Sequence, residues 1–241
     1  MKILIIPDVH LKPWMFTKAE QIGRKEQVDR YVCLGDLVDD WECENNAQIY
    51  QKTLDETLSF AEKHTDTLWC YGNHDLAYLW NVYVTGTSGD DEVRSAAVHG
   101  LMALYNSIPA GRLAFVHRID KVLFSHGGLS RMFVREHVRP SDYEKTGRAL
   151  DQINDLHMKD MWYNDSPLWV RPQAEVFRCN INMYKPRTFL QVVGHTPMQK
   201  ITQDKNLLSC DVFSLMRDRK PYGTQEFCLL DTETWEWKGI K

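Results

Sequence analysis

The 241-residue chain lacks any hydrophobic run long enough to cross a bilayer. No stretch approaches the ~18–20 consecutive apolar residues that a membrane-spanning helix needs. The apolar run near the N-terminus, at 3–6, ends in Pro7-Asp8 and is shorter than the ~7–15 apolar residues of a secretory signal. We therefore predict a protein without a membrane partner or a secretory signal, and read residues 3–6 as a strand.

The chain also lacks an excess of positive charge. It has 29 Lys+Arg against 33 Asp+Glu, which gives a formal net charge of −4. Proteins that wrap nucleic acid need a basic surface against the phosphate backbone. We therefore do not expect a nucleic-acid partner, whereas a small phosphorylated substrate held through metal ions is compatible with this charge.

Cysteine is scattered, and none of the six cysteines forms a CxxC pair or a dense framework. This usage predicts a reducing, cytoplasmic location. Internal repeats, low-complexity tracts and Gly/Ser linkers are absent as well. With 43% hydrophobic and 26% charged residues, the composition is that of a globular protein with one large domain, or at most two small ones.

Short apolar runs alternate with amphipathic stretches over the first third of the chain. Runs at 3–6, 31–34 and 67–71 predict buried strands, and stretches at 17–28 and 46–64 predict helices. This β-α-β-α-β order favours a parallel sheet with right-handed crossovers. The fold class is therefore α/β.

The rest of the chain is richer in strands. Helices are expected at 91–106 and at 141–159, the second with Ser141 and Glu144 as a capping box. Further strands are expected at 113–117, 121–125, 188–193, 198–202, 206–210, 226–230 and 234–237. The C-terminal part therefore predicts a second sheet that is partly antiparallel.

Five of the apolar runs end in a polar cluster. The clusters are Asp8-Val9-His10, Gly35-Asp36-Leu37-Val38-Asp39-Asp40, Gly72-Asn73-His74-Asp75, Ser125-His126-Gly127-Gly128 and Gly194-His195-Thr196-Pro197. Because the functional crevice of an open α/β sheet lies at the carboxyl ends of its strands, all five point to one place. A single Asp or His at a strand end is more often a cap, but five such sets in order indicate a two-metal site. Carboxylate, amide and imidazole ligands favour Mn, Fe, Zn or similar divalent ions.

These clusters closely resemble the DxH, GDxxD, GNH[DE], H and GH motifs of the calcineurin-like metallophosphoesterases, and the matches extend from residue 8 to residue 197. The HGGLS sequence at 126–130 is similar to the phosphoprotein phosphatase branch, and GHTP at 194–197 to its bacterial and phage members. The resemblance implies a four-layer α/β/β/α sandwich with two mixed sheets and the metal site at the strand C-terminal ends. It also implies a single metallophosphoesterase domain over 1–241.

The resemblance further implies a ligand set. Asp8 and His10 would hold the first metal, Asp36 would bridge both metals, and Asn73, His126 and His195 would complete the second. Mn²⁺ is the expected metal, with Fe, Zn, Ni or Co as alternatives. Pro197 stands where relatives with a GHxH motif place a further histidine on the first metal, so a water or nothing is expected there.

The expected activity is hydrolysis of a phosphate ester, of the phosphomonoester or phosphoprotein type, by a hydroxide that bridges the two metals. His74 is the candidate general acid for the leaving oxygen, and Asp39 is placed to orient its imidazole and raise its pKa. Phosphoprotein phosphatases carry phosphate-gripping arginines where this chain has Asp40 and Tyr71. Arg171 is the candidate replacement, against the plainer interpretation of a surface arginine.

Trp41 directly follows a site cluster, so it could stack on a nucleobase. A dinucleoside polyphosphate (nucleotide) hydrolase is therefore an alternative function. A phosphodiesterase or nuclease on the same scaffold is another, which the acidic balance and the absent GHxH make less favoured. A non-catalytic interaction module is the third, but the complete set of candidate ligands together with His74 argues against it.

Overall fold

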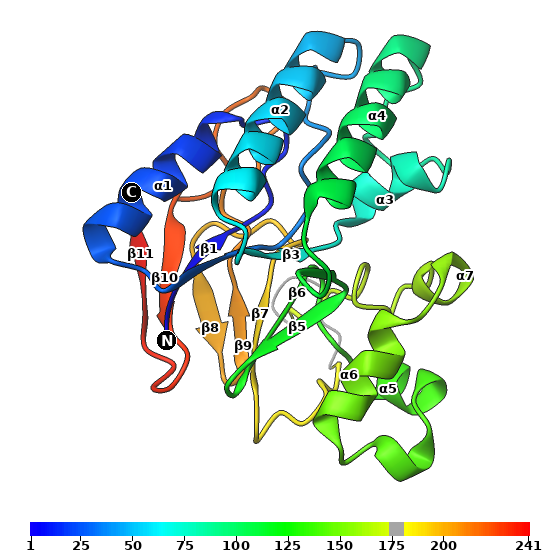
Figure 1. The fold of residues 1–241 in the computed structure, drawn as a ribbon, viewed down its shortest axis with the longest axis vertical. Coiled ribbons are helices and arrows are strands. Elements are labelled where there is room, and N and C mark those ends of the chain that lie inside the picture. The colour runs from blue at the N-terminus through cyan, green and yellow to red at the C-terminus, as the bar shows by residue number, and fades with distance from the viewer. Residues whose placement is uncertain (174–180) are drawn as a thin grey trace.

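Two β-sheets flanked by helices make up the computed structural model, which describes residues 1–173 and 181–241 (Figure 1). The strands are β1 (Lys2–Ile6), β2 (Arg30–Cys33), β3 (Leu68–Cys70), β4 (Leu113–Ala114), β5 (Val116–Ile119), β6 (Val122–Ser125), β7 (Leu190–Val193), β8 (Thr202–Asp204), β9 (Leu207–Ser209), β10 (Phe227–Asp231) and β11 (Trp237–Ile240). The helices are α1 (Trp14–Glu26), α2 (Ala47–Lys63), α3 (Asn73–Leu79), α4 (Asp91–Ser107), α5 (Arg131–His137), η1 (Pro140–Asp142), α6 (Thr146–Asn154) and α7 (Met158–Met161). None of these helices is both long and apolar enough to pass through a membrane.

Sheet A has the strand order β11-β10-β1-β2-β3-β4. Strands β1 to β4 run parallel, with Ile3 opposite Arg30 and Val32 opposite Leu68. Strands β10 and β11 are antiparallel to their neighbours. The parallel part follows from the predicted strand–helix alternation, because α1 and α2 carry the chain back to the starting edge of the sheet.

Sheet B has the order β5-β6-β7-β9-β8. Its three central strands run parallel, and the edge strands β5 and β8 are antiparallel. The chain passes from sheet A to sheet B at Phe115, between β4 and β5. Both sheets are therefore mixed.

The alternation of side chains along β6 shows how the layers stack. Val122 and Phe124 lie in the core that sheet B shares with sheet A, whereas Leu123 lies in a second core with Phe133 of α5 and Ile153 of α6. Helices α1, α2 and α4 gather along one side of the molecule and α5 to α7 on another (Figure 1). The expected α/β/β/α sandwich with two mixed sheets is confirmed.

The predicted helix at 141–159 is wrong, and so is its capping box. The segment divides into η1, α6 and α7, and Ser141 lies inside η1. The chain turns because the Asp142 carboxylate accepts hydrogen bonds from Lys145 Nζ (3.1 Å) and Gln152 Nε2 (3.3 Å). Lys145 is then the N-cap of α6, without a capping side chain.

Other boundaries also differ. The run at 113–117 divides between the two sheets, and the runs at 198–202 and 234–237 mostly precede β8 and β11. Asp231 accepts hydrogen bonds from the backbone nitrogens of Glu233 and Thr234, which makes a turn there. Helices α3 and α5 were not predicted, although Ser130 caps α5 by accepting from the nitrogen of Phe133 at 3.0 Å.

Candidate metal centre

The six candidate ligands all lie just beyond the carboxyl ends of parallel strands. They are Asp8, His10, Asp36 and Asn73 from sheet A, and His126 and His195 from sheet B. Because β1 to β3 are parallel, and β6 is parallel to β7, each set leaves its sheet at a common edge. The structure brings all six residues together.

Two glycines let these strand ends approach. A Cβ atom on Gly72 would overlap the backbone nitrogen of Asp36, and one on Gly194 would overlap the carboxylate of Asp8. The second contact joins the two sheets, since the backbone nitrogen of His195 donates to Asp8 Oδ2 at 2.8 Å. The sequence therefore needs glycine before Asn73 and before His195.

The first ligand group, defined as Asp8, His10 and Asp36, has ligand atoms within 4.8 Å of one another. His10 Nδ1 donates to the carbonyl oxygen of Asp39 at 2.9 Å, so Nε2 is the ring nitrogen that faces the other members of the group. That Nε2 lies 3.9 Å from Asp36 Oδ2. An imidazole fixed through its other nitrogen is typical of metal-ligating histidines.

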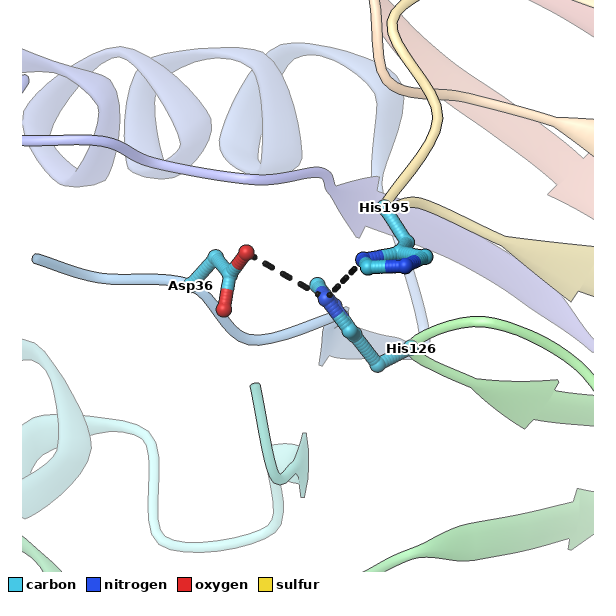
Figure 2. A group of neighbouring side chains, drawn as sticks. All are labelled: Asp36, His126 and His195. Atoms are coloured by element: carbon cyan, nitrogen blue, oxygen red, sulfur yellow. Dashed lines mark hydrogen bonds and ion pairs between the residues drawn. The ribbon is translucent and has the colours of Figure 1, made fainter. Parts of the chain in front are cut away.

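The second ligand group, defined as Asp36, His126 and His195, comes from three separate segments whose side chains point toward one another (Figure 2). His126 Nε2 lies 3.2 Å from Asp36 Oδ2 and 3.0 Å from His195 Nδ1. Asn73 Oδ1 is 2.8 Å from His126 Nε2. Asp36 belongs to both groups and therefore lies between them.

This second group has more acceptors than donors. His126 Nδ1 donates to the carbonyl oxygen of Leu34 at 2.9 Å, so a neutral His126 presents only a lone pair to the other members. Burial disfavours a charged His126, but the carboxylates of Asp36 and Asp8 outweigh it and raise the pKa of His126 to about 9. The cluster therefore needs positive charge, which a proton or a cation can supply.

Two buried polar atoms in the centre, Asp8 Oδ1 and His195 Nε2, have no hydrogen-bond partner among the residues that the structure describes. Buried polar atoms without partners are rare and call for an explanation such as an ion. Together with the Asp, Asn and His donors, they fit divalent cations.

The backbone at the centre is strained. Positive φ angles occur at His10 (44°), Asp36 (48°), Asp39 (66°) and His195 (62°). Such conformations cost about 1–3 kcal/mol each and cluster at functional sites. The surrounding hydrogen bonds must hold these residues in place.

His74 lies in the first turn of α3. Its backbone nitrogen donates to Asp36 Oδ1 at 2.9 Å, and its Nδ1 lies 2.6 Å from Asp39 Oδ2. Burial opposes protonation, but the carboxylates of Asp36 and Asp39 raise the pKa of His74 to about 9. The structure therefore pairs His74 with Asp39 beside the two ligand groups.

A cavity of about 310 Å³ lies over the centre, and His10, Asp36, His74 and His195 are among its lining residues. Trp41 lines it as well, with the guanidinium of Arg217 5.2 Å from the centre of its ring. Both ligand groups therefore have a member at the cavity, and Trp41 lies on its wall.

Arg171 also lines this cavity and is its one Lys or Arg side chain among the described residues. Its guanidinium donates to the carbonyl oxygen of His195 at 2.5 Å and to Thr196 Oγ1 at 3.3 Å. Arg171 therefore braces the loop that carries His195 and also faces the space a substrate would fill.

The two positions where the phosphatases carry arginine are occupied differently here. Asp40 forms an ion pair with Lys12 at 3.0 Å, and both side chains are almost fully buried. Tyr71 packs its ring against Phe115 and Tyr105. Neither position supplies a cation to the cavity.

Asp211 is a further residue at the centre, which the sequence motifs did not predict. This residue follows β9, whose Ser209 is paired with Val193 of β7, so Asp211 and His195 leave sheet B in register. Asp211 is 1% exposed, lines the cavity and accepts a hydrogen bond from Ser214 Oγ at 2.9 Å. Its position after an apolar run was the available signal, but no glycine or histidine accompanies it.

Asp75 was noted as part of a motif but not given a role. Its Oδ1 accepts from the backbone nitrogen of Leu37 at 2.8 Å, and Tyr105 donates to its Oδ2 at 3.3 Å. Asp75 is fully buried. It therefore anchors the loop that follows Asp36.

The sequence matches the family model described as calcineurin-like phosphoesterase over residues 1–221. Because the match covers most of the chain, the protein belongs to the calcineurin-like phosphoesterase family. It is therefore a metal-dependent phosphoester hydrolase, and the family implies divalent metal ions. No protein of curated function matches the chain in sequence.

Solved structures share the fold. A cold-active protein-tyrosine phosphatase from a psychrophilic Shewanella species aligns with a TM-score of 0.58 and 15% identity, covering 100% of this chain and 80% of that chain. A metallophosphoesterase from Sphaerobacter thermophilus aligns with a TM-score of 0.50 and 14% identity, covering 100% of this chain and 88% of the other. At such identities the likeness concerns the fold.

Proposed function

We propose that the protein is a dinuclear phosphomonoesterase related to the phosphoprotein phosphatase branch. The observation that carries the proposal is that Asp36 belongs to both ligand groups, with Asp8 and His10 on one side and His126 and His195 on the other. A two-metal hydrolase needs such a shared carboxylate between ions ~3.5–4 Å apart. Oxygen and imidazole donors suit Mn²⁺, and Fe, Zn, Ni or Co fit the same set.

The proposed roles follow from the contacts. Asp8, His10 and Asp36 would hold one ion, and Asp36, Asn73, His126 and His195 would hold the other. When bound, the ions supply positive charge for the phosphoryl oxygens and acidify the attacking water. Arg171 binds the phosphate from the cavity wall.

His74 is the proposed general acid. Because its Nδ1 is bonded to Asp39, its Nε2 is the nitrogen free to donate a proton to the leaving oxygen. Asp39 fixes the tautomer and the direction of the ring. Both roles need the leaving group to sit in the cavity that His74 lines.

Supporting observations for the phosphatase assignment are the HGGLS sequence at 126–130 and the fold shared with a protein-tyrosine phosphatase. A phosphoprotein is therefore among the proposed substrates.

We further propose one domain over 1–241, since the central core draws residues from Ile3 to Leu230. The free, buried cysteines of the described residues support a cytoplasmic location, and Cys179 lies outside those residues.

A second candidate substrate is a nucleotide or dinucleoside polyphosphate. Trp41 favours it, because an aromatic ring at the cavity wall can stack on a nucleobase. Arg217, whose guanidinium lies 5.2 Å from the centre of that ring, adds a cation beside Trp41.

A hydrolysis screen with added Mn²⁺ tests the proposal, using p-nitrophenyl phosphate, its bis-ester, a phosphopeptide and a dinucleoside tetraphosphate. We expect turnover of the monoester and the phosphopeptide. Asp36→Asn should reduce it by more than about 10³-fold, since the loss of both ions removes several kcal/mol of charge stabilisation. Preferential cleavage of the bis-ester would instead favour a phosphodiesterase. No turnover of any substrate by either protein would favour an interaction module.

A further inference from the structure

We propose that Tyr50 and Tyr78 are positioning residues for His74, which they orient by holding the carboxylate of Asp39 from behind. The proposal rests on the proposed function, because it takes His74 as the general acid. It adds two residues from two helices to the catalytic arrangement. Neither residue belongs to a strand-end cluster.

Both phenols bond the same carboxylate oxygen. Tyr50, from α2, donates to Asp39 Oδ1 at 2.5 Å, and Tyr78, from α3, donates to the same atom at 2.6 Å. His74 Nδ1 takes the other oxygen, Oδ2, at 2.6 Å. Tyr50 and Tyr78 are almost inaccessible to solvent, at 0% and 2% exposure.

The hydrogen bonds to the two carboxylate oxygens fix the orientation of Asp39. With Oδ1 occupied by two donors, Oδ2 is the oxygen left for His74, so the carboxylate cannot rotate without breaking two buried hydrogen bonds. Burial and the nearby Asp39 also raise the pKa of both phenols above the ordinary value, so they remain donors. Asp39 itself has a positive φ of 66°, a conformation that needs such support.

Tyr78 also links the Asp39–His74 pair to the loop that forms part of the cavity wall. The backbone nitrogen of Ser88 donates to the Tyr78 hydroxyl at 2.8 Å, and Ser88 Oγ donates to the carbonyl oxygen of Glu44. Gly86 of the same loop lies so close that a Cβ there would be 3.2 Å from His74 Cε1. Glu44 and Gly86 both line the cavity. The phenols therefore set the position of His74 relative to the wall that a leaving group would touch.

The leaving group distinguishes a positioning role from a merely structural one. An alkoxide needs a proton as it departs, whereas p-nitrophenolate needs it far less. A misplaced His74 should therefore slow alkyl phosphates much more than p-nitrophenyl phosphate. General loss of structure should slow both equally.

The test compares Tyr50→Phe, Tyr78→Phe and the double variant, each measured for kcat on an alkyl phosphate and on p-nitrophenyl phosphate, with metal content and Tm alongside. We expect the double variant to lose about 10–100-fold on the alkyl phosphate, the range typical of supporting residues. On p-nitrophenyl phosphate we expect less than about 3-fold, with metal content unchanged. Tyr31→Phe is the matched control, since its buried ring packs against Phe60 and His64 away from the centre.

Equal losses on both substrates, or no loss, would overturn the inference. The single variants supply the same comparison if the double variant does not fold. His74→Gln separates this failure from that of the proposed function. If His74→Gln shows the leaving-group dependence and the tyrosine variants do not, only the inference is wrong. If His74→Gln shows none while the wild type hydrolyses both esters, the acid role of His74 is wrong as well.

Discussion

The two ligand groups use the same kinds of side chain but differ in exposure and in origin. The first group comes from sheet A alone, and the side chain of its His10 is 18% exposed at the cavity. The second group joins both sheets, and the side chain of its His126 is completely buried. The histidine of the first group therefore reaches the cavity, whereas in the second group His126 lies in the interior and Asp36 and His195 are the members at the cavity.

The histidines are also fixed differently. His10 donates to the carbonyl oxygen of Asp39, in the loop after β2. His126, directly after β6 of sheet B, donates to the carbonyl oxygen of Leu34, directly after β2 of sheet A. The second group is thus part of the contact between the two sheets, and its residues contribute to folding as well as to ion binding.

Truncation of the two histidines should give the largest effects and separate the groups. Either His126→Ala or His10→Ala should lose one ion and about 10³-fold or more in activity. His126→Ala should also lower the free energy of unfolding by at least about 1–3 kcal/mol, because it leaves the Leu34 carbonyl oxygen buried without a donor. Metal analysis and chemical denaturation measure both effects. An equal loss of stability in the two variants would contradict the comparison.

The pH dependence of ion binding should further distinguish the second ligand group. Metal-bound histidine must be deprotonated, and His126 has a pKa of about 9 before the ion binds. The affinity of the second group should therefore rise with pH, by up to about 10-fold per unit, and level off above about pH 9. Calorimetry in buffers of different ionisation enthalpy should detect the released proton. A pH-independent affinity between pH 6 and 8 would show that His126 binds without losing a proton.

Arg171→Ala tests whether the brace of the His195 loop also binds substrate. We expect KM for a phosphomonoester to rise by roughly 12- to 160-fold, since a charge-assisted contact to phosphate contributes about 1.5–3 kcal/mol, with little loss of metal. Arg148, exposed on α6, gives a matched control when changed to alanine. An unchanged KM would remove Arg171 from the substrate site, and loss of one ion would restrict it to bracing His195.

Trp41→Ala should have the smallest effect and one confined to nucleotides. Loss of stacking costs about 0.5–1.5 kcal/mol, or roughly 2- to 12-fold in KM for a dinucleoside tetraphosphate. KM for p-nitrophenyl phosphate should change less. If the nucleotide KM is unaffected, the nucleotide candidate is wrong.

The strand-end clusters could be found in the sequence because each follows an apolar run and pairs a polar residue with local turn chemistry. Asp211 also follows an apolar run, but no glycine or histidine stands beside it, so the local pattern did not mark it. Only the register of β9 against β7 places it beside His195. Local pattern therefore located the five motifs but not the residue that tertiary pairing adds.

The other differences between the predicted and the observed structure also arise from contacts between distant segments. The turn at 141–145 depends on Gln152 reaching back to Asp142, and the split of 113–117 depends on which sheet offers each half a partner. Tyr50 fits the helical apolar pattern of α2, and nothing in that pattern shows where its hydroxyl points. These features depend on packing between segments that are distant in sequence.

The hydrogen bond between the His195 backbone and Asp8 spans 187 positions of the chain. During synthesis, strands β1 to β3 emerge and can pair while the residue that completes the second ligand group has not yet been made. Ion binding at the complete centre must therefore follow translation of β7. A chain interrupted before Gly194 contains the first ligand group but lacks His195, so its second ligand group is incomplete.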